Sequence, residues 1–210
     1  MLTTAKICLL LAMVLSSVSV SGSRQSTAVR SFMPEYTSDA QLKLPENYRE
    51  WVYLTSGFDM SYSADSQMAD HHMFDNVFVD PDAYKKFLET GTWPDKTTLV
   101  LEVREARGKG SINQKGHFQS GVMGLEVHVK DEARFPGKWA FFGFDGEKTG
   151  KMVPTTASCY SCHADHAAVD TTFVQFYPTL LPISRSKGTL SDAYKKEIEI
   201  SAQRRNNARS

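Results

Sequence analysis

Alternating polar and apolar residues mark the strands of this chain. In residues 121–131, Leu125 and Val127 alternate with Glu126 and His128, a period of two that predicts a half-buried antiparallel strand. Three further stretches rich in β-branched and aromatic residues predict strands as well. They are residues 75–80, 97–106 and 137–150, the last ending in a glycine-bearing turn.

Two stretches have the spacing or the end signals of short helices. Residues 44–57 place Tyr48 and Trp51 on one helical face, which predicts an amphipathic helix. In residues 80–91, "DPDAYKKFLETG", Asp80 is an expected N-cap and proline stands at the first helical position. A third short helix is expected at residues 159–163, late in the chain. Strands first and a short helix near the C-terminal end indicate an α+β fold built mainly on an antiparallel sheet with short helices.

The N-terminus has the layout of an export signal. One lysine precedes an apolar run from Ile7 to Leu15, and small residues follow. This pattern predicts a signal peptide over residues 1–22, and the apolar run is too short for a permanent membrane span. Cys8 would be lost with it, so the mature protein would be exported, periplasmic in a bacterium, with two cysteines.

Composition removes some function classes. The 210 residues include 24 basic and 24 acidic side chains, and 41% of residues are apolar. A formal charge of zero gives no reason to expect binding to nucleic acid or to an anionic membrane. The apolar share is enough for one sizeable core.

The stretch "CYSCHADH" at residues 159–166 carries the chemistry. Cys159 and Cys162 are three residues apart and His163 follows directly. This spacing lets two thiols reach the two vinyl groups of a porphyrin while the histidine binds the iron, so it favours one covalent haem c. A disulfide or a metal site remains an alternative. A thioredoxin-like pair is disfavoured because the preceding residues 151–158 are typical of a loop.

The second axial position has no strong candidate. No methionine follows His163, and His166 lies one turn further along the same helix face, so it cannot reach the other side of a porphyrin. The histidines His71, His72 and His117 could supply a distal ligand, but solvated loop positions are more typical. A methionine earlier in the chain could also fold back onto the iron, although methionine is more often a core residue, so the residues alone leave the sixth position open.

Four segments together resemble the cytochrome P-460 family, which includes the β-sheet cytochromes c′. They are residues 44–52, 77–95, 126–145 and 159–180. The resemblance implies a mostly antiparallel β fold, a homodimer, and one five-coordinate haem c per subunit. It makes Cys159 and Cys162 the thioether residues and His163 the proximal iron ligand.

One position divides this family. Members that oxidise hydroxylamine carry a lysine, cross-linked to the haem, directly before a glutamate, and here Leu101 precedes Glu102. Leucine has no nucleophilic atom, so the chain is similar to the c′-beta side, whose members have an apolar distal pocket. Leu101 is then the expected distal cap, and Phe74 and Phe78 are expected pocket residues. Asp75 is a candidate proton acceptor.

The sequence thus predicts an exported monohaem cytochrome that binds nitric oxide or a similar small nitrogen oxide, with a redox partner protein as a further expectation. The alternatives are a hydroxylamine or nitric oxide oxidoreductase, an electron carrier, and a colourless disulfide-bearing domain. The expected boundaries are a flexible segment at 23–43, the haem domain at 44–182, and a C-terminal tail at 183–210. The tail is expected to be helical to about Ile200 and disordered beyond.

Overall fold

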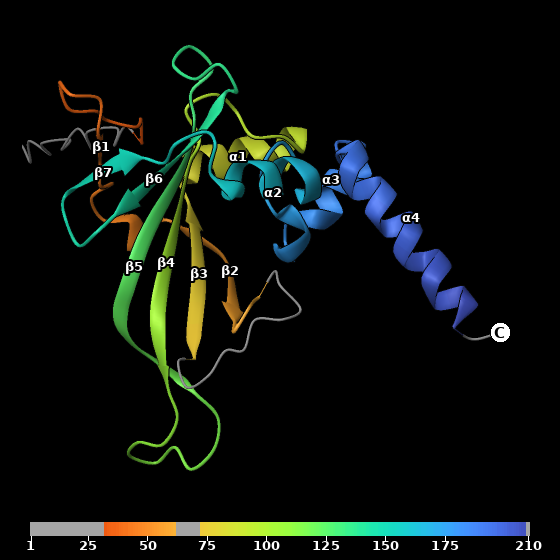
Figure 1. The fold of residues 1–210 in the computed structure, drawn as a ribbon, viewed down its shortest axis with the longest axis horizontal. Coiled ribbons are helices and arrows are strands. Elements are labelled where there is room, and N and C mark those ends of the chain that lie inside the picture. The colour runs from red at the N-terminus through yellow and green to blue at the C-terminus, as the bar shows by residue number, and fades with distance from the viewer. Residues whose placement is uncertain (1–31, 62–71, 209–210) are drawn as a thin grey trace, which may run out of the picture. The chain divides into compact units, whose positions relative to one another are not determined.

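A seven-stranded antiparallel sheet organises the chain in a computed structural model, which describes residues 32–61 and 72–208 (Figure 1). The order across the sheet is β1-β7-β6-β5-β4-β3-β2. The strands are β1 (Leu42–Lys43), β2 (Val52–Phe58), β3 (Met73–Val79), β4 (Thr98–Arg107), β5 (Phe118–Lys130), β6 (Trp139–Phe144) and β7 (Thr149–Met152). The predicted α+β class is confirmed.

Four α-helices and two single 3-10 turns complete the described residues. The helices are α1 (Pro81–Thr90), α2 (Ser158–His166), α3 (Leu181–Lys187) and α4 (Asp192–Asn207), and the turns are η1 (Tyr48–Glu50) and η2 (Val174–Phe176). Helix α1 begins and ends as predicted. The Asp80 carboxylate accepts the backbone N–H of Ala83 at 2.7 Å, and Gly91 ends the helix with a left-handed φ of 76°.

The helix predicted over residues 44–57 is wrong. Only the single turn η1 forms there, and residues 52–58 are strand β2, which pairs antiparallel with β3. Val52, Tyr53 and Thr55 are β-branched or aromatic residues that suit a pleated strand, and the pairing with β3 satisfies their backbone groups. Tyr48 and Trp51 have helical spacing, but no α-helix joins them. Both side chains are buried in the same apolar cluster, which explains why both positions are apolar.

Each face of the sheet packs against its own apolar cluster. On one face, helix α1, the turn η2 and the chain around them bury Leu99 of β4 together with Phe87 and Trp93. On the other face, Val100 and Val127 pack with Tyr48 and Trp51. The side chains of neighbouring strand residues point to opposite faces, so the two clusters alternate along β4. We call the face that carries Leu99 the helical face.

Strand β5 is covered on both sides at its C-terminal end. Val127 and Val129 are fully buried, as the alternation predicts. His128 and Lys130 lie on the helical face and are also buried. These two residues, which the sequence pattern assigns to a polar face, contact Thr171 and Asp170 of the chain that follows β7, while Glu126 stays exposed.

Near both ends, the described chain has more regular structure than the sequence predicts. Leu42 is fully buried and β1 pairs with β7, so part of the predicted segment 23–43 packs on the sheet. Helix α4 continues to Asn207, beyond the expected end at Ile200. The predicted domain boundaries otherwise stay predictions, and the signal peptide over residues 1–22 lies outside the described residues. Among the described residues, no helix is long and apolar enough to cross a membrane.

Candidate haem-binding site

Helix α2 presents the Cys-x-x-Cys-His motif on the helical face of the sheet. Pro154 and the loop after β7 lead into the helix, and Tyr160, between the two cysteines, anchors it. The Tyr160 hydroxyl accepts the backbone N–H of Phe141 at 3.2 Å and donates to the carbonyl of Val153 at 3.1 Å. The motif is thus tied directly to β6 and to the chain after β7.

The two cysteines are available for chemistry. Cys159 and Cys162 are partly exposed, and no disulfide joins them in the structure. One helical turn separates them, so both thiols lie along the same side of α2. Among the described residues, no group of three or more His, Cys, Asp or Glu side chains is placed to hold a metal ion, so the zinc alternative has no ligand set here.

His163 is held in one tautomer. Its Nδ1 lies 2.7 Å from the carbonyl oxygen of Thr171, and a carbonyl can only accept, so Nδ1 carries the hydrogen. Nε2 then keeps its lone pair for an iron ion. Burial lowers the pKa of His163, while the bond to Thr171 raises it, and the net lowering favours the neutral ring that ligates metals.

Aromatic rings surround the His163 imidazole. Its centroid lies 4.2 Å from that of Phe173 and 4.6 Å from that of Phe141. The imidazole of His128 lies edge-on at 5.4 Å and stacks on Phe141 at 3.9 Å. His128 is 8% exposed, and burial holds its pKa well below the usual value, with the nearby His163 adding to the effect. This ring therefore packs as a neutral group.

Strand register places Leu101 one step from this cluster. Leu99 pairs with His128, which pairs with Phe141, so these three share the helical face. Two residues along, Leu101 pairs with Glu126 on β5 and with Val77 on β3. Because residues two apart share a face, Leu101, Val77 and Glu126 lie beside the row that contacts His163.

The predicted pocket residues Phe74 and Phe78 lie on the sheet face opposite Leu101. Phe78 pairs with Val100 and contacts the rings of Tyr48 and Tyr53, on the face opposite Leu101. Phe74 is four residues back on the same strand, shares that face, and contacts Phe58. The period of two along β3 separates both phenylalanines from Leu101, whereas Val77 and Asp75 lie on its face.

Asp75 lies in the next row along the helical face, where it pairs with Val103. Burial raises the pKa of Asp75, and the carboxylates of Glu126 and Asp59 raise it further. A carboxyl group with a raised pKa can accept and release a proton nearer to neutral pH. The sequence singled out Asp75 but not Glu126, which the alternation alone assigns to a polar strand face.

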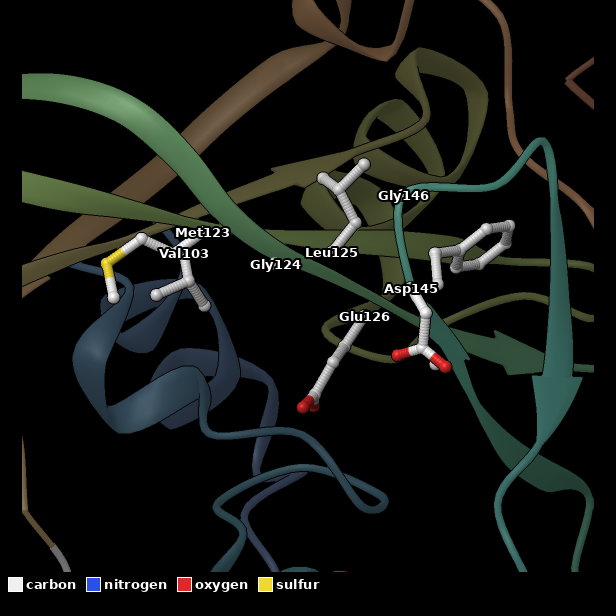
Figure 2. A pocket seen from close by; sticks show the side chains of 9 residues that line it. Val103, Met123, Gly124, Leu125, Glu126, Asp145 and Gly146 are labelled. Atoms are coloured by element: carbon white, nitrogen blue, oxygen red, sulfur yellow. The ribbon is translucent and has the colours of Figure 1, made fainter.

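A small cleft opens beside Glu126, with a volume of about 210 Å³ (Figure 2). Its lining comes from β4, β5, the end of β6 and the turn that follows β6. The carboxylates of Glu126 and Asp145 point to the same side of β5, while Leu125 points to the other. Met123 and Val103 form the apolar end of the cleft. Apolar residues and carboxylates therefore meet at one opening on this part of the sheet.

The other histidines lie elsewhere. His72 pairs with Asp59 and its ring lies 4.9 Å from that of His117, next to Phe58. His71 lies outside the described residues. His166 pairs with Glu197 of α4 at 3.2 Å, on the exposed side of α2. His72 and His117 both contact Phe58, whereas the His163 ring contacts Phe141 and Phe173.

These residues fit a haem. Two unbonded thiols on one helix turn and a neutral imidazole with a free Nε2 form the donor set that haem needs, and the apolar side chains of Val77 and Leu101 lie beside them. Such a group would supply a redox-active iron ion. The profile of the Cytochrome P460 family matches residues 45–174, more than half of the chain.

The chain belongs to the cytochrome P460 family. Family membership indicates a haem cytochrome, in agreement with the residues above. The search of curated proteins finds no match.

Proposed function

We propose that this member of the cytochrome P460 family is an exported, monohaem c-type cytochrome of the c′-beta kind, which binds nitric oxide at a five-coordinate iron. In this proposal Cys159 and Cys162 form the thioethers. Each thiol adds across a vinyl double bond, so a carbon–sulfur bond forms and the thiol hydrogen moves to the neighbouring carbon, with no net oxidation. His163 is the proximal ligand through Nε2, since Thr171 occupies its Nδ1.

The apolar strip beside the His163 cluster carries the proposal. Val77, Leu101 and Val103 are partly buried, adjacent, and on the helical face of the sheet. None of the three has a hydrogen-bond donor to stabilise a polarised bound dioxygen. Nitric oxide needs such help less, so an apolar distal side favours it over dioxygen. A homodimer and a redox partner protein remain part of this proposal on the resemblance alone.

One observation favours the second candidate, an enzyme that oxidises hydroxylamine or nitric oxide. Glu126 stands directly opposite Leu101, and Asp75, with its raised pKa, lies on the same face. Oxidation of hydroxylamine releases protons and electrons. The two carboxylates could accept the protons, and a redox partner protein would have to accept the electrons.

The test is a set of absorption spectra of the purified protein: ferric, ferrous, ferrous with nitric oxide, and the pyridine haemochrome. The proposal expects a c-type haemochrome, a high-spin ferrous band, and a new band with nitric oxide. A ferrous band displaced strongly to the red would indicate a modified macrocycle and favour the enzyme. A low-spin ferrous spectrum that does not change with nitric oxide would overturn the five-coordinate assignment. Met123, which lines the cleft, would then be the candidate for the sixth ligand.

Turnover separates the two candidates further. Purified protein would be mixed with hydroxylamine and a chemical electron acceptor, alongside the Glu126→Gln variant. The gas-binding proposal expects no turnover in either. Sustained reduction of the acceptor by the wild type, lost by roughly 100-fold or more in Glu126→Gln, would instead assign a general base and make the protein an enzyme.

A further inference from the structure

The carbonyl that orients His163 belongs to a tight turn at residues 169–172. Val169 and Thr172 form a backbone bridge, and Asp170 sits between them with a left-handed φ of 50°. The Thr172 hydroxyl donates to the carbonyl of Val169 at 2.8 Å, which closes the turn. The Thr171 carbonyl that accepts from His163 therefore takes its direction from the whole turn.

Side chains from β5 and from the chain before β4 contact three successive residues of this turn. The Lys130 ammonium lies 3.3 Å from the Asp170 carboxylate and also donates to the Trp93 carbonyl at 2.8 Å. Nε2 of His128 lies 3.3 Å from the Thr171 hydroxyl. The Trp93 indole N–H donates to the Thr172 hydroxyl at 2.7 Å.

These three holding residues are buried. Lys130, His128 and Trp93 have exposed fractions of 7, 8 and 2%. Lys130 and His128 are two residues apart on β5, so one strand supplies two of the three contacts. A buried lysine is costly unless it is paired, and the Lys130 ammonium pairs with Asp170 of the turn at 3.3 Å and with Glu132 at 3.6 Å. The bridge and the hydrogen bond between Val169 and Thr172 already close the turn, so the contacts from Lys130, His128 and Trp93 serve to fix its position.

We propose that His128 and Lys130 are positioning residues for the proximal ligand, which hold the 169–172 turn so that the Thr171 carbonyl stays on Nδ1 of His163. Thr171 connects the two histidines, since its carbonyl serves His163 and its hydroxyl serves His128. This inference rests on the proposed role of His163 as iron ligand. A strong Nδ1–H···O=C bond makes the imidazole a better donor, which strengthens the iron–histidine bond and favours ferric iron.

The test uses full-length holoprotein and two readouts that do not depend on catalysis. Resonance Raman measures the iron–histidine stretch of the ferrous form, and a potentiometric titration measures the haem midpoint potential. His128→Phe keeps a ring to stack on Phe141 and removes the hydrogen bond to Thr171. His128→Gln restores an amide within reach of that hydroxyl. Asp170→Asn removes the charge pair with Lys130 but tolerates the left-handed φ.

We expect His128→Phe and Asp170→Asn to lower the iron–histidine frequency and raise the potential, and His128→Gln to lie closer to wild type. A tenfold loss of preference for ferric over ferrous iron corresponds to about 59 mV for one electron. The matched controls are His117→Phe, in the ring cluster around Phe58, and Asp192→Asn, at the start of α4. Neither should move either readout.

Unchanged Raman frequency and potential in both His128→Phe and Asp170→Asn would overturn the inference, while leaving the haem assignment intact. Failure of the proposed function shows separately, because a wild-type protein without a c-type haemochrome or an iron–histidine band would remove the ligand itself. If His128→Phe does not fold, Asp170→Asn alone decides, since the Asp170 side chain is partly exposed, asparagine has nearly the same size, and Lys130 keeps its contacts with Trp93 and Glu132.

Discussion

Leu101 and Glu126 face each other across β4 and β5, and the two side chains favour different chemistry at one place. Leucine offers a bound ligand only dispersion contacts, whereas the glutamate offers a proton acceptor. The outcome depends on which of the two is closer to the open position of the iron. A substitution at Leu101 tests this directly. A polar side chain at this position would add a hydrogen-bond donor, while the backbone pairing of β4 would stay the same.

Leu101→Gln should raise the dioxygen affinity of the ferrous protein by about tenfold, because an amide hydrogen bond contributes about 1.4 kcal/mol to a polarised ligand. Nitric oxide affinity should change much less. Equilibrium titrations of anaerobic ferrous protein with each gas measure both. Ile112→Gln is the control, since Ile112 is 94% exposed. If dioxygen affinity does not change in Leu101→Gln, Leu101 is not on the distal side.

The neighbouring residue Glu102 points to the opposite face and has a structural role. It is 2% exposed and accepts hydrogen bonds from Arg104, Arg49 and Tyr48. Burial raises the pKa of Glu102, but these three donors outweigh burial and hold the pKa below its usual value of 4.5. A carboxyl group of this kind stabilises the fold above its unfolded pKa, and this contribution is lost as pH falls through the folded pKa.

Glu102→Gln should therefore lower the free energy of unfolding by about 2–3 kcal/mol at pH 7, since it removes the carboxylate from two arginines. The difference from wild type should shrink as pH falls below about 4.5. Urea denaturation at pH 7 and at acidic pH measures it. Glu105→Gln is the comparison, because its pair with Arg107 is exposed and should contribute less than about 1 kcal/mol. A pH-independent loss in Glu102→Gln would mean that packing, and not charge, is responsible.

At the scale of elements, Asp80 joins α1 to the sheet. Its carboxylate accepts from the backbone of Ala83 in α1 and, at 3.0 Å, from the backbone of Thr98 in β4. One side chain thus satisfies the helix N-terminus and the start of the strand that carries Leu101. The connection fixes where α1 lies on the helical face, so that its Phe87 packs against Trp93.

Asp80→Ala should destabilise the protein by about 2 kcal/mol, since it removes a cap and leaves a second buried N–H without a partner. Asp80→Asn should cost less, because an amide oxygen can still accept one of the two hydrogen bonds. Thermal unfolding followed by circular dichroism compares the two. Equal losses in both variants would show that the negative charge, and not the capping bond, stabilises this junction.

The same scale shows how far the sequence could predict the fold. Helix α1 was predictable because Asp80, Pro81 and Gly91 are local signals. The helix over 44–57 was not correctly predicted, since strand β2 forms by pairing with β3, a partner that local spacing does not reveal. The prediction of a solvated polar face on β5 failed for a similar reason, because it depends on contacts with a later segment of the chain. The alternation predicts solvated positions for His128 and Lys130, but both are buried, in contact with Thr171 and Asp170 respectively.

The motif itself was predictable, and its surroundings were not. Cys159, Cys162 and His163 are adjacent in sequence, so their joint role needs no knowledge of the fold. Phe74 and Phe78 seemed plausible beside Leu101 only because the strand register was unknown, and pairing with Val100 puts Phe78 on the far face. The Thr171 carbonyl and Glu126 could not be found at all, because each depends on a contact between distant segments.

For the whole molecule, haem binding and folding should be linked. Val77, Leu101 and Val103 form an apolar strip on the helical face that is only partly buried by the chain. The proposed haem would cover this strip, and a ligand that binds only the folded state stabilises it. The holoprotein should therefore be more stable than the same chain without haem.

The double variant Cys159→Ala/Cys162→Ala, purified without haem, should unfold about 2–4 kcal/mol more easily than the holoprotein. Without haem, the partly buried side chains of Val77, Leu101 and Val103 would each lose part of the roughly 1.5–3 kcal/mol of stabilisation that full burial provides. Urea denaturation followed by circular dichroism measures the difference. Ser161→Ala, in the same helix but with both thiols retained, should keep its haem and its stability. Equal stability of the haem-free and holo forms would mean that the haem does not cover this strip, and Leu101 would then lose its place in the distal pocket.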